Sequence, residues 1–458
     1  MKFQYLSAGL MVLFLLAREV KAQVPAVPAN VDASFSRTIA LKECLKLSVA
    51  NSPRLRIAGL EQIRLRYNYK ATAGMGLPQV NFSGSYDDYL QLPTQMIPDI
   101  FSNPPNPDEM IPIQFGTSFN IAGGLDAGQL LYNQSWLVAM KLARQMEQQN
   151  ELATEKTHIE VVYEVAQSYY LTQITMQQIR NMQSNLVKIE KAEKIAASQY
   201  ENGLIKKIDL DRIVVQKLNM ITDIERLQVL YQQEIAMQKY FMGLDQGETI
   251  SPEDSITTSI IFPGEESNLT GHIDIRLLEM QKQVVNTTIR MDQAGYYPNL
   301  TLIGSVNYMN QSNTMYLFGK PTDWFNTSLV GIRLTVPVFS GMQRHNKVNQ
   351  SRIELEKLKV MEDDAKRLIR INSEDAARKL LNSAEAEKRQ RDNMKLAEKV
   401  YGISQEQYEQ GVIPLTDLLN AETALSDAQA NHIYSLVQMK ISELNYLKAN
   451  GRLLGFFD

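Results

Sequence analysis

Two eleven-residue segments of this 458-residue chain are near-copies of each other, and each ends a long stretch without helix breakers. Residues 200–210 read YENGLIKKIDL and residues 408–418 read YEQGVIPLTDL. Neither Gly nor Pro occurs from residue 129 to 202 or from residue 342 to 401. Such stretches predict single long helices, the second with only Gly402 before its tip, and Gly203 and Gly411 in the two copies can adopt the left-handed conformation that ends a helix. We therefore expect a tandem duplication with two helix-hairpin tips.

The elements predicted in the first repeat, residues 38–243, fall in a simple order. A helical segment begins near Thr38, breaks near Pro53 and stops at Gly74. Strands follow at about 79–87 and 115–125, because apolar and polar residues alternate there. The long helix then runs to Gly203, and a return helix covers about 208–241. Between the strands, residues 90–113 hold six prolines, which we interpret as a loop because no helix or central strand tolerates them.

A linker at residues 244–270 precedes the second repeat, residues 271–458, which has the same predicted order. A helix is expected at about 273–294, followed by strands at about 299–308 and 327–339. The second long helix then leads to Gly411 and a return helix to about residue 447. The predicted fold class is mainly α with a small β part.

The N-terminus predicts export. Lys2 precedes an apolar run at residues 10–17, and Val20-Lys21-Ala22 suits cleavage after Ala22. Residues 1–22 are therefore interpreted as a signal peptide and residues 23–37 as a linker. Cys44, the only cysteine, lies too far from the cleavage point for lipid modification and is expected on a buried helix face. The formal net charge of −4, with acids and bases interleaved, gives no sign of nucleic acid binding.

The pattern of the four strands predicts that they lie in a membrane. Each has one apolar and one polar or small face, and no second sheet is predicted to cover the apolar side. That alternation suits a barrel with lipid outside and water inside, yet four strands cannot close. Open edges in lipid leave backbone groups unsatisfied at several kcal/mol each. We therefore expect several copies to share one barrel, and three copies would give twelve strands.

The helices fit the same architecture. A helix of about 70 residues is roughly 100 Å long. The two shorter helices of each half, stacked end to end, would match that length. Heptad-like stripes on the return helices include Leu210, Ile213, Met220, Ile224, Leu227 and Tyr231, and then Leu418, Ala421, Leu425 and Ala428. Two stripes on the first long helix, one with Val161 and Val165 and one with Ile159, Val162, Ala166 and Tyr169, predict two helical neighbours.

Several segments, in their order and spacing, resemble the TolC-type outer-membrane efflux protein family. LKECLKLSVANSPRLR at residues 41–56 resembles its N-terminal region, and LTVPVFSGMQ at residues 334–343 resembles its junction from strand to long helix. The two Tyr-x-x-Gly-x-x-x-x-x-Asp segments resemble its periplasmic tips. The resemblance covers nearly the whole mature chain. It implies a homotrimer in the outer membrane of a Gram-negative bacterium, with a twelve-stranded barrel continued by a periplasmic α-helical barrel.

The resemblance also implies partners and site residues. A periplasmic adaptor protein and an inner-membrane pump or ABC transporter would engage the tips and open them. The adaptor-docking positions are Gly203, Leu204, Gly411 and Val412. Asp417 matches an acidic position at the closed entrance. Asn420 stands where some members have a second Asp, and Ile413 where some have Arg, so the sequence supports neither a second Asp ring nor an Arg lock.

Local chemistry leaves some of these assignments open. Gly203 and Gly411 are needed for the turns whatever the function. Asp209 and Asp417 could be helix caps or entrance residues. Tyr200 and Tyr408 are expected to pack within their hairpins. The four histidines, His158, His272, His345 and His432, stand singly without metal spacing and are expected at the surface or in helix seams.

The leading hypothesis is a passive exit duct opened by an adaptor, and the alternative is an exported soluble coiled-coil scaffold without a channel. Phosphate-binding loops, nucleophile elbows and paired catalytic carboxylates are absent from the sequence, so we expect neither an enzyme nor a cofactor or metal site. Without an ATP site, the energy for transport must come from a partner. The exported substrate is not encoded in any motif, since drugs, metal ions and unfolded proteins all fit a wide tunnel.

Overall fold

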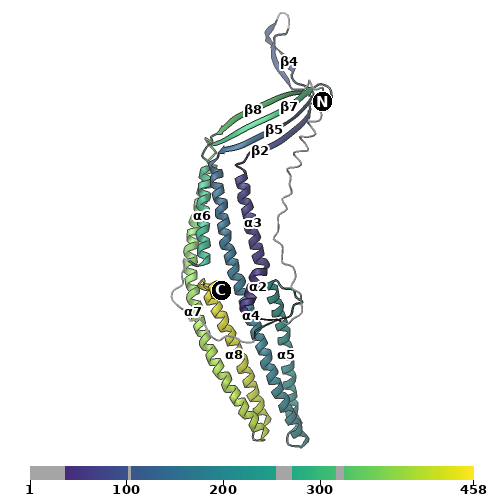
Figure 1. Ribbon diagram of the computed structural model, residues 1–458, viewed down its shortest axis with the longest axis vertical. Helices are drawn as coiled ribbons and strands as arrows, with labels where there is room; N and C mark the ends of the chain where they lie inside the picture. The colour runs from purple at the N-terminus through teal and green to yellow at the C-terminus, as the bar shows by residue number, and fades with distance from the viewer. Residues whose placement is uncertain (1–36, 102–104, 254–270, 316–323, 458) are drawn as a thin grey trace.

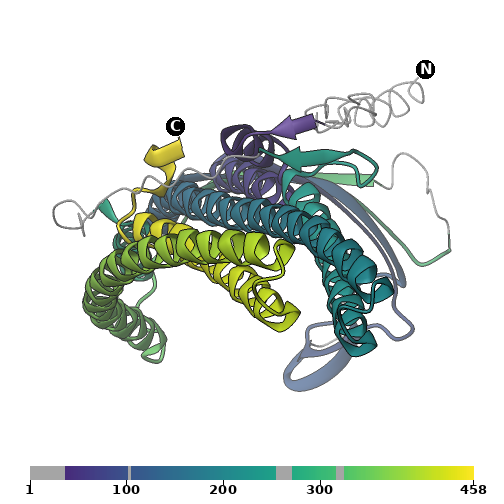
Figure 2. The same cartoon turned by 90° about the horizontal axis from the view of Figure 1, so that it is seen from below.

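The computed structural model describes residues 37–101, 105–253, 271–315 and 324–457. The expected signal peptide and parts of both linkers lie outside these residues. The described chain is elongated, with a β-sheet at one end, two helical hairpin tips at the other, and long helices between them (Figure 1). Seen along its length, the helical part forms a curved layer (Figure 2).

Two long helices run most of the length of the molecule. Helix α4 (Gln134–Glu201) has 68 residues and α7 (Gln343–Glu409) has 67, so each is about 100 Å long. Helices α3 (Pro53–Gly74) and α5 (Lys207–Met242) lie one after the other along α4, while α6 (Ile273–Ala294) and α8 (Leu415–Ala449) lie along both α4 and α7 (Figure 1). The expected end-to-end stacking of the shorter helices is thus present.

Four strands form one antiparallel sheet in the order β2-β5-β7-β8. They are β2 (Gln79–Asp88), β5 (Phe119–Tyr132), β7 (Asn299–Ser312) and β8 (Trp324–Thr335). The register places Phe82 opposite Leu125, and Leu125 opposite Val306. One face therefore collects the apolar residues of all four strands, as the alternation predicts.

Strand β5 extends further than expected, and this shortens the helix that follows. Residues 129–132 continue the pairing with β7, so α4 begins at Gln134 and not at residue 129. The Asn133 side chain then caps the helix by accepting a hydrogen bond from the Trp136 backbone N–H at 2.9 Å. The lack of Gly and Pro could not predict where α4 begins, because the Asn133 cap and the pairing of β5 with β7 determine that boundary.

Two small strand pairs correct the expectations. Residues 90–113 were expected to be a loop, but β3 (Thr94–Asp99) and β4 (Asn106–Gln114) form a hairpin that projects beyond the main sheet (Figure 1). A two-stranded hairpin has only edge strands, which tolerate Pro because one side of each strand makes no ladder. Near the N-terminal side, β1 (Arg37–Ile39) pairs in parallel with β6 (Ile250–Pro252), so the first helix begins after Thr38, at Leu41.

A central apolar cluster lies midway along α4. The stripes predicted on this helix are confirmed, since Val161, Val162, Val165, Ala166 and Tyr169 are buried. Helix α2 (Leu41–Asn51) packs here through its buried Cys44 and Leu45, and α9 (Leu453–Phe457) through Leu453. Burial raises the pKa of Cys44 to about 12, so its thiol is inert at neutral pH.

The helices of the described residues are amphipathic or polar in character. None of them carries an apolar stretch long enough to cross a bilayer.

The packing of β5 against β7 provides a matched test of the sheet. A Cβ on Gly124 would lie 2.7 Å from the Val306 carbonyl oxygen and closer still to Asn307, whereas a Cβ on Gly128 meets nothing within 4 Å. We expect Gly124→Ala to destabilise the protein by about 1–3 kcal/mol through overpacking. Gly128→Ala on the same strand should change stability much less. Thermal unfolding of both purified variants compares them, and equal midpoints would contradict the register described here.

Candidate functional site

The two tips have the same backbone geometry. Gly203 has φ of +73° and Gly411 has φ of +71°, and each directly follows the C-cap residue of its long helix. The Leu204 N–H donates to the Gln199 carbonyl at 2.8 Å, and the Val412 N–H donates to the Gln407 carbonyl at 2.8 Å. The Gly203 and Gly411 N–H groups donate to the carbonyls of Tyr200 and Tyr408, and the two bonds at each tip together define a Schellman motif. The turn role predicted for both glycines is confirmed.

The residues after the glycines are exposed and apolar. Leu204 is 74% exposed and Val412 is 66% exposed, so each tip presents one large aliphatic side chain to solvent. A bare aliphatic side chain at the end of a hairpin adds nothing to the packing of the hairpin. It leaves apolar area that a partner can remove from water.

The two aspartates sit in the first turns of the return helices but do not cap them. The N-cap residues are Lys206 for α5 and Pro414 for α8, so the capping interpretation of Asp209 and Asp417 is wrong. Both carboxylates lie where the helix dipole favours negative charge. Asp209 pairs with Arg212 at 3.4 Å, while Asp417 is exposed.

Asn420 lies one turn after Asp417 on α8 and is also exposed. Residues three apart on a helix share a face. Asp417 and Asn420 therefore form one polar surface close to the second tip.

The two tip tyrosines differ, although they occupy matching positions in the sequence copies. Tyr408 is 3% exposed, and its hydroxyl donates a hydrogen bond to Gln199 Oε1 at 3.0 Å. Burial raises the pKa of Tyr408, and the negative charge of Asp209 adds to the effect. Tyr200 is 41% exposed, so the expectation that it packs within its hairpin is wrong. Tyr408 instead joins one hairpin to the other.

Further contacts connect the first hairpin (α4 and α5) to the second (α7 and α8). We call this set of contacts the hairpin seam. Lys191 of α4 pairs with Glu409 of α7 at 2.6 Å, at the surface. The Lys188 ammonium of α4 lies 5.2 Å from the centre of the Tyr401 ring of α7. Sequence reasoning missed these residues because the partners lie more than 200 positions apart.

An apolar cluster fills the space between the two hairpins. Its buried members come from all four helices: Ile189, Ala192, Ala196, Ile213, Met220, Ile224, Tyr401, Tyr408, Leu415, Leu418, Ala421 and Leu425. The predicted stripe residues Leu210, Ile213, Met220, Ile224, Leu418, Ala421 and Leu425 are thus confirmed as part of the tip core, whereas Tyr231 packs against the central cluster. Ile413 packs against this cluster and serves as part of the apolar packing.

At the other end of the molecule, the sheet exposes its apolar face. Val80, Phe82, Val330 and Ile332 are between 62% and 82% exposed, and all four belong to the same face by register. Among the residues that the structure describes, β2 pairs with β5 alone and β8 with β7 alone, so both outer edges have unpaired backbone groups. This surface and these edges are unsuited to contact with water.

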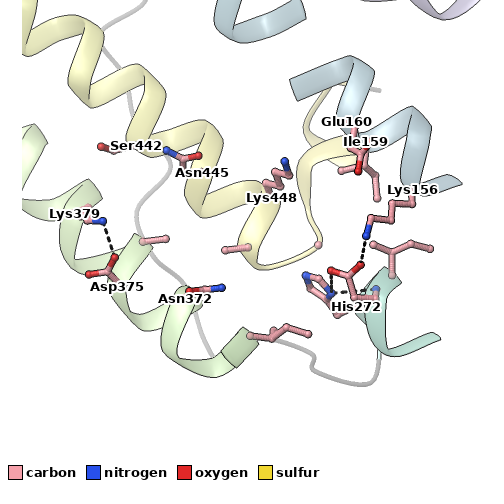
Figure 3. A pocket seen from close by; sticks show the side chains of 16 residues that line it. Lys156, Ile159, Glu160, His272, Asn372, Asp375, Lys379, Ser442, Asn445 and Lys448 are labelled. Carbon is pink, nitrogen blue, oxygen red and sulfur yellow. Dashed lines mark hydrogen bonds and ion pairs between the residues drawn. The ribbon is translucent and has the colours of Figure 1, made fainter. Parts of the chain in front are cut away.

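A cavity of about 370 Å³ lies where α8 ends and α6 begins, between α4 and α7 (Figure 3). Its charged side chains are largely paired. Lys156 bonds Asp274 at 2.8 Å, and Lys379 bonds Asp375 at 2.8 Å. His272 caps α6 by accepting from the Asp274 backbone N–H, and burial lowers its pKa. The cavity lies at the junction of α6 and α8 with the two long helices.

The remaining histidines stay separate from one another. His432 lies 3.1 Å from Glu387, within a helix seam as expected, and His345 lies at the surface beside Asn349. Among the described residues, no three His, Cys, Asp or Glu side chains come together in a way that would hold a metal ion.

Comparison with known proteins gives a consistent result. The family model described as "Outer membrane efflux protein" matches residues 44–238 and 267–452. The cation efflux system protein CusC of Escherichia coli O6:H1 is 24% identical over 311 residues. That alignment covers 66% of this chain and 61% of CusC, so this chain spans less than two thirds of its curated relative.

Solved structures share the fold. A crystal structure of CusC superposes with a TM-score of 0.68 at 18% identity, covering 93% of this chain and 97% of that one. A membrane protein from Pseudomonas aeruginosa gives a TM-score of 0.70 at 18% identity, with 93% and 98% covered. The outer membrane protein VceC of Vibrio cholerae gives 0.68 at 14% identity, with 90% and 96% covered.

The tip glycines can be tested against Gly402, a glycine in the interior of α7. We expect Gly203→Ala and Gly411→Ala each to destabilise the protein by about 1–2 kcal/mol, because both residues have the left-handed backbone. Gly402→Ala should stabilise it by up to about 1 kcal/mol, since Gly402 lies within α7 with open space around it. Chemical or thermal unfolding measures whether each variant is more or less stable than the wild type. A stabilised Gly411→Ala variant would contradict the turn geometry.

Proposed function

We propose that this chain, which belongs to the outer membrane efflux protein family, forms one third of a passive exit duct. Its place is the outer membrane, as for the family. In the proposed assembly, three copies share a twelve-stranded barrel in the bilayer, and their helices continue it as a tunnel through the periplasm. The duct is shut at the tips and opens when an adaptor protein engages them.

The observation that supports this proposal most strongly is the exposed apolar face of a sheet with two open edges. Lipid is the surrounding in which the exposed side chains are stable. Within lipid, however, each unpaired N–H or C=O costs several kcal/mol. Pairing of the β8 edge of one copy with the β2 edge of the next removes that cost at every junction. Membrane barrels begin at about eight strands, so one four-stranded copy is insufficient.

The helical layer supports the same arrangement independently. In the tip half of the molecule α5 and α7 carry exposed apolar stripes on their outer faces, which include Val215 and Leu218 on α5 and Leu396 and Val400 on α7. Leu218 lies 15 residues after Gly203, and Leu396 lies 15 residues before Gly411. With the same rise per residue, the two leucines stand at similar heights above the tips. The α7 stripe of one copy and the α5 stripe of the next can therefore cover each other.

The tips are proposed as the docking surface for a periplasmic adaptor. Gly203 and Gly411 set the turns, and the exposed Leu204 and Val412 supply the apolar contact area. Near them, Asp417 and Asn420 form the polar surface proposed to line the entrance, with Asp209 behind it in its ion pair with Arg212. Energy for transport comes from an inner-membrane pump or ABC transporter that works with the adaptor.

In this proposal the inner-membrane pump selects the substrate, and the duct does not. CusC is named as a cation efflux protein. In the described residues of this chain, however, no cluster of metal-ligating side chains marks a cation path. The proposal therefore covers a general water-filled passage, and co-purification after crosslinking at the tips identifies the pump.

Self-association can be tested with a pair of cysteines. We expect Leu218→Cys with Leu396→Cys, made in the full chain, to form disulfide-linked trimers on mild oxidation in outer membranes. Gel electrophoresis without reductant detects them. The matched control replaces Leu396 by Cys and leaves Leu218 unchanged, and it should yield monomers, because Cys44 is buried. A double variant that stays monomeric, in a fraction that washes off the membrane with salt, would favour the soluble scaffold instead.

Ion selectivity tests the entrance. In a trimer, three Asp417 carboxylates would surround one axis and attract cations. We expect Asp417→Asn to lower the ratio of cation to anion permeability in single-channel recordings. Asp211→Asn, which removes an exposed carboxylate from the first hairpin, is the control and should leave the ratio nearly unchanged. Equal selectivity in wild type and Asp417→Asn would reject the carboxylate ring.

A further inference from the structure

A carboxylate is buried inside the tip core. Glu422 lies on α8, seven residues after Leu415 begins the helix, and is 1% exposed. Its Oε2 accepts a hydrogen bond from Gln216 Nε2 of α5 at 3.2 Å. Its Oε1 is buried without a hydrogen-bond partner. Glu422 therefore joins the second hairpin to the first through one bond and leaves half of its carboxyl group unsatisfied.

Glu422 lies beside the apolar stripe of α8, directly after Ala421. Leu418 precedes it by four residues and Leu425 follows by three, and both are completely or almost completely buried. Gln429, one heptad after Glu422, accepts a 2.8 Å hydrogen bond from the buried Asn185 side chain of α4. Glu422 and Gln429 of α8 thus make polar contacts to the first hairpin.

The charges around Glu422 do not neutralise it. Among the described residues, no Lys, Arg or His nitrogen lies within ion-pair distance of its carboxylate. Lys188 of α4 is the cation that acts on it, but the ammonium bonds Asn185 Oδ1 at 3.3 Å and lies over the Tyr401 ring of α7. Asp427 of α8 and Tyr401 add negative or ionisable groups, and α5 presents only the neutral Gln216.

Burial in these surroundings favours the neutral acid. Burial raises the pKa of Glu422, while the bond from Gln216 and the charge of Lys188 oppose the rise. A protonated carboxyl group loses much less than a carboxylate when it is removed from water. Separation of the two hairpins would return Glu422 to water and restore its ordinary pKa.

We propose that Glu422 is a protonation-dependent latch between the two hairpins, whose neutral form holds the tip shut and whose ionised form favours separation. The latch deepens the proposed function, because it rests on hairpin separation as the step that opens the entrance. It differs in place and physics from Asp417, which is exposed and acts on passing ions. Glu422 acts through the packing of the hairpin seam.

The direction of the pH effect follows from linkage. The shut form has the raised pKa, so the stabilisation it gains from the neutral acid is complete below the ordinary Glu pKa. That stabilisation is lost as the pH rises through the raised pKa. Opening therefore releases a proton, and the ratio of open to shut hairpins increases with pH by at most about tenfold per pH unit in each protomer.

The experiment measures hairpin separation directly in the full-length protein in lipid nanodiscs. Spin labels are placed at Lys194→Cys on α4 and Lys399→Cys on α7, both exposed, while the buried Cys44 stays unlabelled. Inter-label distances are recorded by pulsed electron resonance from about pH 5 to about pH 9. The Glu422→Gln variant keeps the shape of the side chain and is uncharged at every pH. Glu387→Gln is the matched control, a buried glutamate of α7 that already contacts His432 and Arg391.

We expect the long-distance population to increase with pH in the unmodified tip and in Glu387→Gln, and to stay small at every pH in Glu422→Gln. A population that is independent of pH in all three proteins would overturn the latch, as would equal pH dependence in Glu422→Gln. Conductance measured in planar bilayers tests the proposed duct separately from the proposed latch. A pore with pH-independent hairpins refutes the latch alone, whereas pH-dependent hairpins without any pore refute the duct and retain the latch.

Discussion

The unpaired edges of the four-stranded sheet constrain everything else in this molecule. The sheet presents an apolar face to its surroundings, with Phe82 at 71% and Val330 at 82% exposure, and the backbone of β2 and β8 is unpaired on one side. The apolar face requires lipid, while the unpaired edges are costly in lipid. Only continuation of the sheet by other strands satisfies both requirements. In the proposed trimer, identical copies supply those strands.

The long helices connect the sheet to the hairpin tips, so the position of the sheet determines the position of the tips. Helix α4 begins directly after β5 and contacts α3, α5, α6 and α8 along its length, so it is the common support of the curved layer (Figure 2). Helix α7 follows β8 after a short connection at residues 336–342. A ring closed at the sheet therefore places the tips of three copies around one axis. At the tips the two hairpins meet through Tyr408, Lys191 and Glu422, and this seam, not the sheet, is where the duct is proposed to open.

Much of the fold could be predicted because its signals are local. Runs without Gly or Pro marked the long helices, alternation marked the strands, and Gly203 and Gly411 marked the turns. The failures have non-local causes. Helix α4 starts later than expected because β5 keeps its pairing with β7 up to Tyr132. The β3–β4 hairpin tolerates its prolines because it has only edge strands.

The candidate site was predicted less completely. Matching sequence positions suggested matching roles for Tyr200 and Tyr408, yet only Tyr408 faces the opposite hairpin. Sequence copies preserve the turn but not the neighbours that each tip meets. Glu422 gave no sequence signal, since the predicted stripe of Leu418, Ala421, Leu425 and Ala428 passes beside it. Its burial depended on α5 and on the apolar cluster around it, which the sequence of α8 alone does not reveal.

The mass of the particle extracted from outer membranes with mild detergent tests the central claim most directly. Native mass spectrometry of that particle should give three chains, and hydrogen exchange should show slow amides on the outer edges of both β2 and β8. A single chain that remains in solution without detergent, with fast exchange on those two edges, would contradict the account.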